Sequence, residues 1–154
     1  MLSYKLIINK LLKKGITLSV AESFTGGLLS SIFIKTPGIS KIFNMGLITY
    51  SNDSKKKILR ISTKNIKKYG AVSNVVAKEM LINLHKISKS KLCISTTGIA
   101  GPSGGTNNKP VGLVYIGIKF NKKIIILEKK IKGTRNQIKQ QSIKYIFNYL
   151  DKLL

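Results

Sequence analysis

Apolar and polar residues alternate along the chain with two periods, and these separate the expected helices from the expected strands. Apolar side chains three or four residues apart predict amphipathic helices, and Ser73 and Thr134 fit the N-cap positions of two of them. Gln137, three residues after Thr134, completes a capping box. Helices are therefore expected over residues 3–14, 28–34, 53–60 and 73–88, and from Thr134 to the C-terminal end.

Short apolar runs rich in β-branched residues predict strands over residues 16–21, 43–50, 92–96, 111–120 and 123–130. The last two are separated only by Asn121 and Lys122, so they are expected to form an antiparallel hairpin. The earlier strands alternate with helices, which favours parallel pairing through crossover connections. This order predicts an α/β fold: a three-layer α/β/α sandwich with a mixed, mostly parallel sheet of about five strands.

The length and the apolar content of the chain set its expected organisation. Its 154 residues suffice for an apolar core, so residues 1–154 are expected to form a single domain. No apolar run approaches the roughly 18 residues of a membrane span, and the N-terminal segment lacks a signal peptide's apolar core and cleavage site. The expected location is the cytoplasm, without membrane association. A homodimer is the default expectation, because dimers are the commonest assemblies of soluble proteins.

The formal net charge of +23 invites a nucleic-acid-binding interpretation, because lysine and arginine neutralise phosphates. Among the 28 basic residues, however, only Arg60 and Arg135 are arginine, the better bidentate partner for phosphates and bases. Lysine is spread along the whole chain, which is typical of a compositional bias. Non-specific adhesion to nucleic acid is therefore expected, but no specific nucleic-acid partner.

The chain has few groups that could hold a metal ion. It contains one histidine, one cysteine and five acidic residues without a D-x-D or E-x-x-H pattern, so no disulfide, metal site or cofactor is expected. His85 lies in the expected helix 73–88 and is predicted to face solvent. Cys93 lies in the expected strand 92–96 and is predicted to pack as a small apolar group.

Two segments without lysine or arginine, residues 21–34 and 92–108, are rich in glycine and small hydroxyl residues. Both contain the end of an expected strand, and ligands of α/β folds gather at the carboxyl ends of strands. The turn Ser23–Gly27 has three interpretations: a serine nucleophile, a cradle of N–H groups for a phosphate or an oxyanion, or a helix cap with closely packed glycines. The spacing leaves all three open.

The second neutral segment continues into a long polar loop over residues 98–110, which contains Lys109. Such a loop could wrap a phosphorylated ligand with Lys109 as its counter-charge, or it could be an ordinary surface loop. It is not a Walker A loop, because no GKS or GKT follows its glycines.

Polar residues also follow the strand expected over residues 43–50. A lysine near serine and tyrosine, pushed toward neutrality by burial or by other cations, serves as a general base, and Lys55 follows Tyr50 closely enough for this role. The choice of Lys55 over Lys56 rests on its spacing from Tyr50. Glu22, beside Ser23, could orient a partner or pair with a lysine.

Five motifs follow one another along the chain, at Ala21–Gly27, Gly46–Asn52 with Lys55, Gly70–Ser73, Thr97–Gly105 and Lys109–Gly112. Together they resemble the C-terminal domain of the competence-damage-inducible (CinA) family, which includes stand-alone nicotinamide-nucleotide amidohydrolases. The resemblance covers about residues 3–152. Larger members of the family carry an additional N-terminal domain.

The resemblance implies an α/β/α sandwich that hydrolyses nicotinamide mononucleotide to nicotinate mononucleotide and ammonia, without a metal or a cofactor. It implies Ser23 as the nucleophile, with Tyr50 and Lys55 activating it or relaying its proton to the departing ammonia. N–H groups at the turn would stabilise the oxyanion, and these belong to Thr25, Gly26 and Gly27. The remaining implied substrate-binding residues are Thr97, Gly98, Gly101, Gly104, Gly105, Lys109 and Arg135.

Two positions depart from the family pattern. Phe24 stands where the family commonly has cysteine or a small residue, and its ring could repack the rim of the pocket. Lys139 stands where a second arginine is common, so a bidentate phosphate contact becomes a point charge. Two alternatives to an amidohydrolase also remain open: a basic, nucleic-acid-associated or competence-related binding module, or a catalytically degenerate member that still binds a nucleotide.

Overall fold

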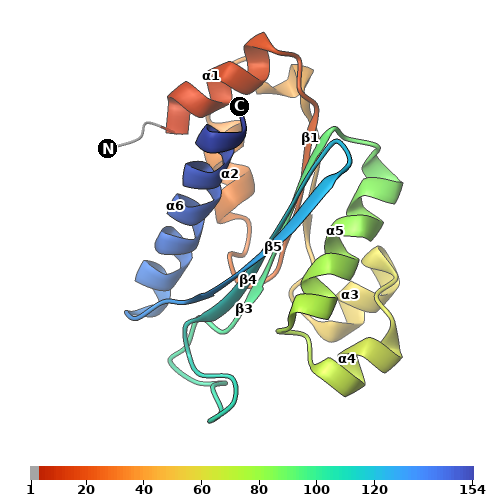
Figure 1. Ribbon diagram of the computed structural model, residues 1–154, viewed down its shortest axis with the longest axis vertical. Helices are drawn as coiled ribbons and strands as arrows, with labels where there is room; N and C mark the ends of the chain where they lie inside the picture. Colours follow the sequence, from red (N-terminus) through yellow and green to blue (C-terminus); the bar gives the residue numbers. More distant parts are fainter. Residues whose placement is uncertain (1–3) are drawn as a thin grey trace.

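The computed structural model describes residues 4–154 (Figure 1). Its strands are β1 (Leu18–Glu22), β2 (Phe43–Ile48), β3 (Leu92–Gly98), β4 (Leu113–Phe120) and β5 (Lys123–Lys130). Its helices are α1 (Tyr4–Lys13), α2 (Leu28–Ile34), α3 (Asn52–Leu59), α4 (Thr63–Tyr69), α5 (Asn74–Ser88) and α6 (Arg135–Leu153), with a 3-10 turn η1 (Ile39–Lys41).

The five strands form one sheet in the order β2-β1-β3-β4-β5. The strand β1 pairs in parallel with both β2 and β3, whereas β4 is antiparallel to β3 and to β5. Helices α1, α2 and α6 cover one face and α3, α4 and α5 cover the other (Figure 1). The expected three-layer α/β/α sandwich with a mixed sheet is thus confirmed.

An apolar core lies on each face of the sheet. On the α1–α2–α6 side, Phe33 is fully buried and its ring lies 5.4 Å from that of Phe147 and 6.2 Å from that of Phe43. On the other side, α5 contributes Met80, Leu81 and Leu84 to a second cluster. All five residues of β1 are buried, as expected for a strand covered on both faces.

The predicted helix starts at Ser73 and Thr134 are confirmed, because both side chains accept N-cap hydrogen bonds and Thr134 and Gln137 form a capping box. The helix α4 was not predicted. It is rich in lysine and has no buried residue, so it lacks the apolar stripe that marks a helix in a sequence. The side chain of Ile87, at the end of the predicted stripe of α5, is exposed to 47%.

Glu22 is the last residue of β1, and its fully buried carboxylate caps the start of α2. Its Oε2 accepts hydrogen bonds from the N–H groups of Gly27 and Leu29 at 3.0 and 3.1 Å. Its Oε1 accepts from the N–H and the hydroxyl of Ser30 at 2.8 and 2.6 Å. Glu22 thus orients a partner, the start of α2, and does not pair with a lysine among the described residues. Its buried carboxylate also holds the glycine turn after Ser23 in place.

Replacement of Glu22 by glutamine tests this cap. Both carboxylate oxygens accept from N–H groups, so an amide NH2 in either position faces a donor and leaves buried helix amides unpaired. We expect Glu22→Gln to lower the free energy of unfolding by about 2–4 kcal/mol, measured by urea denaturation. The matched control Glu128→Gln changes an exposed residue and should stay within about 0.5 kcal/mol. Equal effects of the two variants would contradict the cap.

Candidate active site

A pocket of about 170 Å³ opens at the carboxyl ends of β1, β2 and β3. Ser23 follows β1 and Tyr50 follows β2, while Thr97 and Gly98 end β3. The pocket is lined by Ser23, Phe24, Tyr50, Asn52, Lys55, Ala71, Val72, Thr97, Gly98, Ala100 and Arg135. Residues far apart in the sequence therefore meet at the edge of the sheet where an α/β fold binds its ligands.

The central contact of this pocket joins Lys55 and Ser23. The Lys55 Nζ lies 2.9 Å from the Ser23 Oγ, and the two side chains are only 1% and 7% exposed. The same Nζ donates to the carbonyl oxygens of Thr49 at 2.7 Å and Tyr50 at 3.2 Å. No carboxylate lies within salt-bridge distance of it in the described part of the chain.

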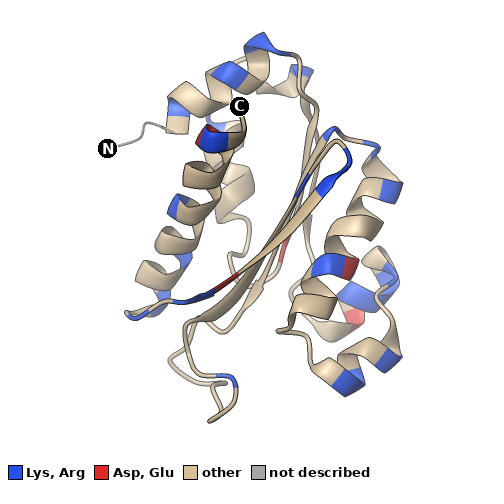
Figure 2. Ribbon diagram, in the orientation of Figure 1, with Lys and Arg blue, Asp and Glu red and all other residues tan. Residues whose placement is uncertain are grey.

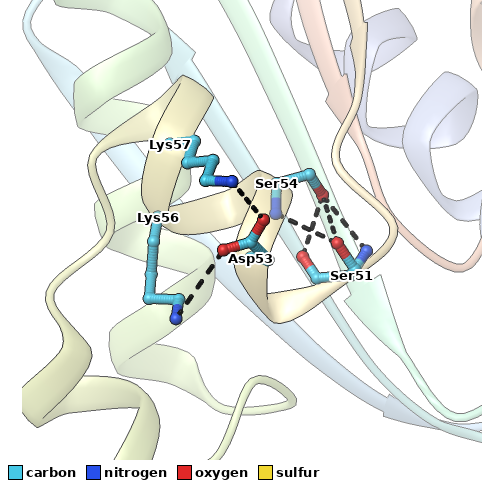
Figure 3. A network of polar contacts seen from close by, with 5 residues as sticks. All are labelled: Ser51, Asp53, Ser54, Lys56 and Lys57. Carbon is cyan, nitrogen blue, oxygen red and sulfur yellow. Dashed lines mark hydrogen bonds and ion pairs between the residues drawn. The ribbon is translucent and has the colours of Figure 1, made fainter.

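The first turn of α3 directs Lys55 into the pocket. Ser51 caps the helix: its Oγ accepts from the N–H of Ser54 at 3.0 Å, and the Ser54 Oγ accepts from the N–H of Ser51 at 3.1 Å (Figure 3). Lys56 and Lys57 instead pair with the exposed Asp53 at 4.0 and 3.0 Å (Figure 3). The structure thus distinguishes Lys55 from its lysine neighbours.

Burial makes Lys55 a base near neutral pH. Removal of the ammonium from water lowers the pKa of Lys55 from 10.5 to about 8. A neutral amine has two N–H donors, which match the two carbonyl acceptors, and its lone pair is then free to accept the Ser23 hydroxyl proton. The geometry therefore suits removal of a proton from Ser23, which is what activates a serine nucleophile.

Arg135 and Tyr50 lie at the exposed mouth of the pocket. The Arg135 guanidinium donates to the Tyr50 hydroxyl at 2.7 Å and to the carbonyl of Gly101 at 3.0 Å. Within residues 4–154 no carboxylate pairs with Arg135. The Tyr50 phenol thus contacts Arg135, and only the Tyr50 carbonyl contacts Lys55.

Two further walls are held by buried contacts. The Thr97 hydroxyl donates to the carbonyl of Ala71 at 2.8 Å, which joins the end of β3 to the loop before α5. The ring of Phe24 is 3% exposed and forms one wall. That ring belongs to a small apolar cluster with Ala100, Val114, Ile131 and Ile138.

The predicted glycine turn lies beside this pocket and lines a second hollow of about 410 Å³. Thr25, Gly26 and Gly27 share that hollow with Lys139, from α6. The N–H of Gly26 donates to the Ser23 carbonyl at 3.0 Å and that of Gly27 to Glu22, so both are already engaged. The Thr25 hydroxyl is 2.8 Å from that of Thr96.

Besides the glycine turn, four predicted substrate-binding residues lie outside the pocket lining: Gly101, Gly104, Gly105 and Lys109. Gly104 and Gly105 are exposed in the loop after β3. The Lys109 ammonium donates to the carbonyl oxygens of Tyr69 and Val72, the latter at 2.7 Å. Lys109 therefore caps the end of α4 and ties the loop to this helix. Its ammonium, which the sequence suggested as the counter-charge of a phosphate, is engaged by these carbonyl groups.

Other pocket residues had no role in the sequence interpretation. Asn52, Ala71 and Val72 line the pocket, and each lies inside a motif whose function was not assigned residue by residue.

His85, predicted to face solvent, is half-buried, and its Nδ1 lies 3.1 Å from the carbonyl of Ser90. Cys93 is fully buried, and burial raises the pKa of its thiol, so its prediction as a packing residue is confirmed.

No group of three metal-ligating side chains occurs among the described residues. None of the helices described there is both long and apolar enough to cross a membrane.

The lowered pKa of Lys55 predicts a specific dependence of stability on pH. Between about pH 8 and 10.5 the unfolded chain binds a proton on Lys55 that the folded chain has released, so the wild type gains stability as the pH rises. We expect its free energy of unfolding to rise by about 3 kcal/mol relative to Lys55→Met over this range. Denaturation at several pH values measures this, and a difference that does not change with pH would contradict it.

Comparison with known proteins identifies the family of this chain. The chain is 47% identical over 142 residues to the CinA-like protein of Fusobacterium nucleatum subsp. nucleatum. The aligned segment covers 92% of this chain but 34% of that protein. It therefore spans about a third of the length of the curated relatives that it matches.

Solved structures share the fold over nearly the whole chain. The competence/damage inducible protein CihA from Agrobacterium tumefaciens superposes with a TM-score of 0.92 at 32% identity, over 97% of this chain and 92% of that one. A competence-damaged protein (CinA) superfamily protein from Escherichia coli gives 0.91 at 25% identity, over 100% and 94%. The family model described as the CinA C-terminal domain matches residues 3–154, so the chain belongs to the CinA C-terminal domain family.

Proposed function

We propose that this chain is a nicotinamide-nucleotide amidohydrolase, which converts nicotinamide mononucleotide to nicotinate mononucleotide and ammonia. The observation that carries the proposal is the 2.9 Å contact between the buried Lys55 amine and the Ser23 hydroxyl. Membership of the CinA C-terminal domain family supports the choice of substrate. Because the chain spans a third of its curated relatives, the proposal concerns this domain alone.

The reaction starts from neutral Lys55. Its Nζ takes the Ser23 proton while the Oγ attacks the carboxamide carbon, and a tetrahedral oxyanion forms. Lys55 then returns the proton to the amide nitrogen, the carbon–nitrogen bond breaks, and ammonia leaves an ester on Ser23. Water, deprotonated by the same lysine, hydrolyses this ester to the carboxylate and restores the serine.

The oxyanion needs N–H donors that the fold does not already use. The amides of Gly26 and Gly27 are engaged by Ser23 and Glu22. Within residues 4–154 no hydrogen bond uses the amides of Phe24 or Thr25, which directly follow the nucleophile. We assign the oxyanion to these two amides, because donors adjacent to the attacked carbon stabilise the charge that develops there.

The pocket is large enough for only one part of the substrate. A volume of about 170 Å³ is below the roughly 300 Å³ of a typical site for a whole ligand, so it suits the pyridine carboxamide alone. The ribose and the phosphate would lie at the mouth, where the Arg135 guanidinium, which pairs with no carboxylate of residues 4–154, offers a bidentate phosphate partner. Lys139 lies in the neighbouring hollow as a second cation.

The basic charge does not favour the nucleic-acid-binding alternative. Lysines lie on helices of both layers and at the β4–β5 turn, without a single basic face in this view (Figure 2). Within residues 4–154 the lysines are therefore spread over several elements, which does not favour a binding module.

Ammonia release from nicotinamide mononucleotide tests the proposed activity. We expect Ser23→Ala and Lys55→Met each to lower kcat by at least about a thousandfold. The matched control Lys56→Met, which removes the neighbouring surface lysine, should keep its activity. A wild type that binds the nucleotide without releasing ammonia would identify a degenerate member.

The pH profile tests the role of Lys55 separately. Protonated Lys55 cannot accept the serine proton, so kcat/KM should rise about tenfold per pH unit below pH 8 and level off above it. A profile that is flat from pH 6 to pH 9, or that falls with rising pH, would contradict a lysine base.

Arg135 is expected to recognise the phosphate. Arg135→Gln should raise the KM for nicotinamide mononucleotide by about 10–100-fold and leave kcat/KM for nicotinamide riboside, which lacks the phosphate, nearly unchanged. Steady-state kinetics with both substrates measure this, and an equal loss for both would show that Arg135 acts only through its contacts with Tyr50 and Gly101.

A further inference from the structure

The charged side chains at the candidate active site are positive. Among the residues that line the pocket, Lys55 and Arg135 carry charge and none is an aspartate or a glutamate. Lys139 adds a third cation in the neighbouring hollow. The carboxylate of Glu22, next to Ser23 in the chain, instead accepts hydrogen bonds from the glycine turn and the start of α2. A positive ligand therefore meets cations in this pocket and finds no counter-ion among its lining residues.

The other titratable groups around Lys55 have partners outside the pocket or do not line it. On its own helix, Asp53 pairs with the two lysines that follow Lys55. On α5, which packs against α3, the Glu79 carboxylate accepts hydrogen bonds from the start of α4. The Tyr50 phenol accepts from Arg135. The remaining titratable residues of α5, none of which lines the pocket, are Lys78, His85 and Lys86. Lys55 is therefore the group of the pocket lining whose charge can change near neutral pH.

The substrate of the proposed reaction brings a further positive charge into this pocket. Ribose is attached to the ring nitrogen of nicotinamide mononucleotide, so its pyridine ring is a cation. The carboxamide carbon that Ser23 attacks is bonded to this ring, and the Lys55 Nζ lies 2.9 Å from the Ser23 Oγ. An attack distance of about 3 Å then places the ring charge roughly 5–8 Å from the Lys55 amine. Because the Lys55 side chain is 1% exposed, little water screens the two charges from one another.

Resting on the proposed function, we propose that the pyridinium ring of the substrate expels the proton of Lys55 as it binds, so that the substrate generates its own base. The ring charge is covalent and cannot leave, whereas the ammonium proton passes to water at the mouth of the pocket. The neutral Nζ keeps two N–H donors for the carbonyl groups of Thr49 and Tyr50, and its lone pair then accepts the Ser23 proton. The step needs no other reactant.

A neutral ring does not have this effect. Reduced nicotinamide mononucleotide retains the carboxamide, the ribose and the phosphate, but its ring is uncharged. With this ligand the pKa of Lys55 stays at about 8, so the amine remains largely protonated at pH 7. The two forms of the nucleotide are therefore matched probes that differ in the charge of the ring.

Proton release measured by isothermal titration calorimetry tests this inference. Ser23→Ala, which cannot form the ester, is titrated with nicotinamide mononucleotide at pH 7.5 in two buffers of different ionisation enthalpy. We expect about half a proton or more to be released for each nucleotide bound. The reduced nucleotide should release about a tenth of a proton or less.

Two further variants assign the proton to Lys55. Lys55→Met has no amine at this position and should release almost no proton with either nucleotide. The matched control, Lys56→Met in the Ser23→Ala background, removes the neighbouring surface lysine instead and should release as much as Ser23→Ala alone. Circular dichroism checks that the variants are folded.

The outcomes separate this inference from the proposed function on which it rests. Binding of nicotinamide mononucleotide without proton release, or equal release by its two forms, would overturn the inference and leave the proposed activity standing. Equal release by Lys55→Met would overturn it as well. If nicotinamide mononucleotide did not bind at all, both the inference and the proposed function would fail.

The pH profiles of the active wild type give a second readout. The profile of kcat/KM reports the free enzyme, whereas that of kcat reports the enzyme with bound substrate. The acid limb of kcat should therefore lie about one pH unit or more below that of kcat/KM. Two limbs that coincide would contradict the expulsion of the proton.

Discussion

A lysine buried against a serine is the contact on which the rest of this structure depends. The fold removes the Lys55 amine from water, gives it two carbonyl acceptors and places the Ser23 hydroxyl 2.9 Å away. Burial disfavours the charged form of the lysine, so the fold stabilises the neutral base that a serine nucleophile requires. This arrangement costs about 3 kcal/mol of stability at neutral pH, and the surrounding structure has to offset that loss.

The elements around this pair act as its frame. Glu22 fixes the turn after Ser23 from inside the sheet, and the Ser51 cap starts α3 so that Lys55 faces the pocket. Lys109 ties the glycine-rich loop to α4, and Arg135 joins that loop to Tyr50 at the mouth. Each of these contacts uses a polar group to hold an element in place, which leaves few backbone donors near Ser23 free for a ligand.

Much of this frame could be predicted from the sequence, for reasons that particular residues make clear. The strands and the caps at Ser73 and Thr134 have local signals, so they were found, whereas α4 lacks an apolar stripe and was missed. The meeting of Ser23, Tyr50 and Thr97 followed from their places at strand ends, and that of Lys55 from its spacing after Tyr50. The partners of Lys109 and of the Tyr50 phenol did not, because they lie 37 or more residues away and depend on side-chain direction.

The titration of Lys55 itself tests this account most directly. In a sample with isotope-labelled lysine side chains, NMR follows each amine with pH, and Lys55→Arg identifies the signal of residue 55. The account predicts one lysine that titrates near pH 8 while the others titrate near 10.4. A Lys55 signal that titrates with the other lysines would mean that burial does not lower the pKa of Lys55, and the neutral amine would then be too rare at neutral pH to serve as the base for Ser23.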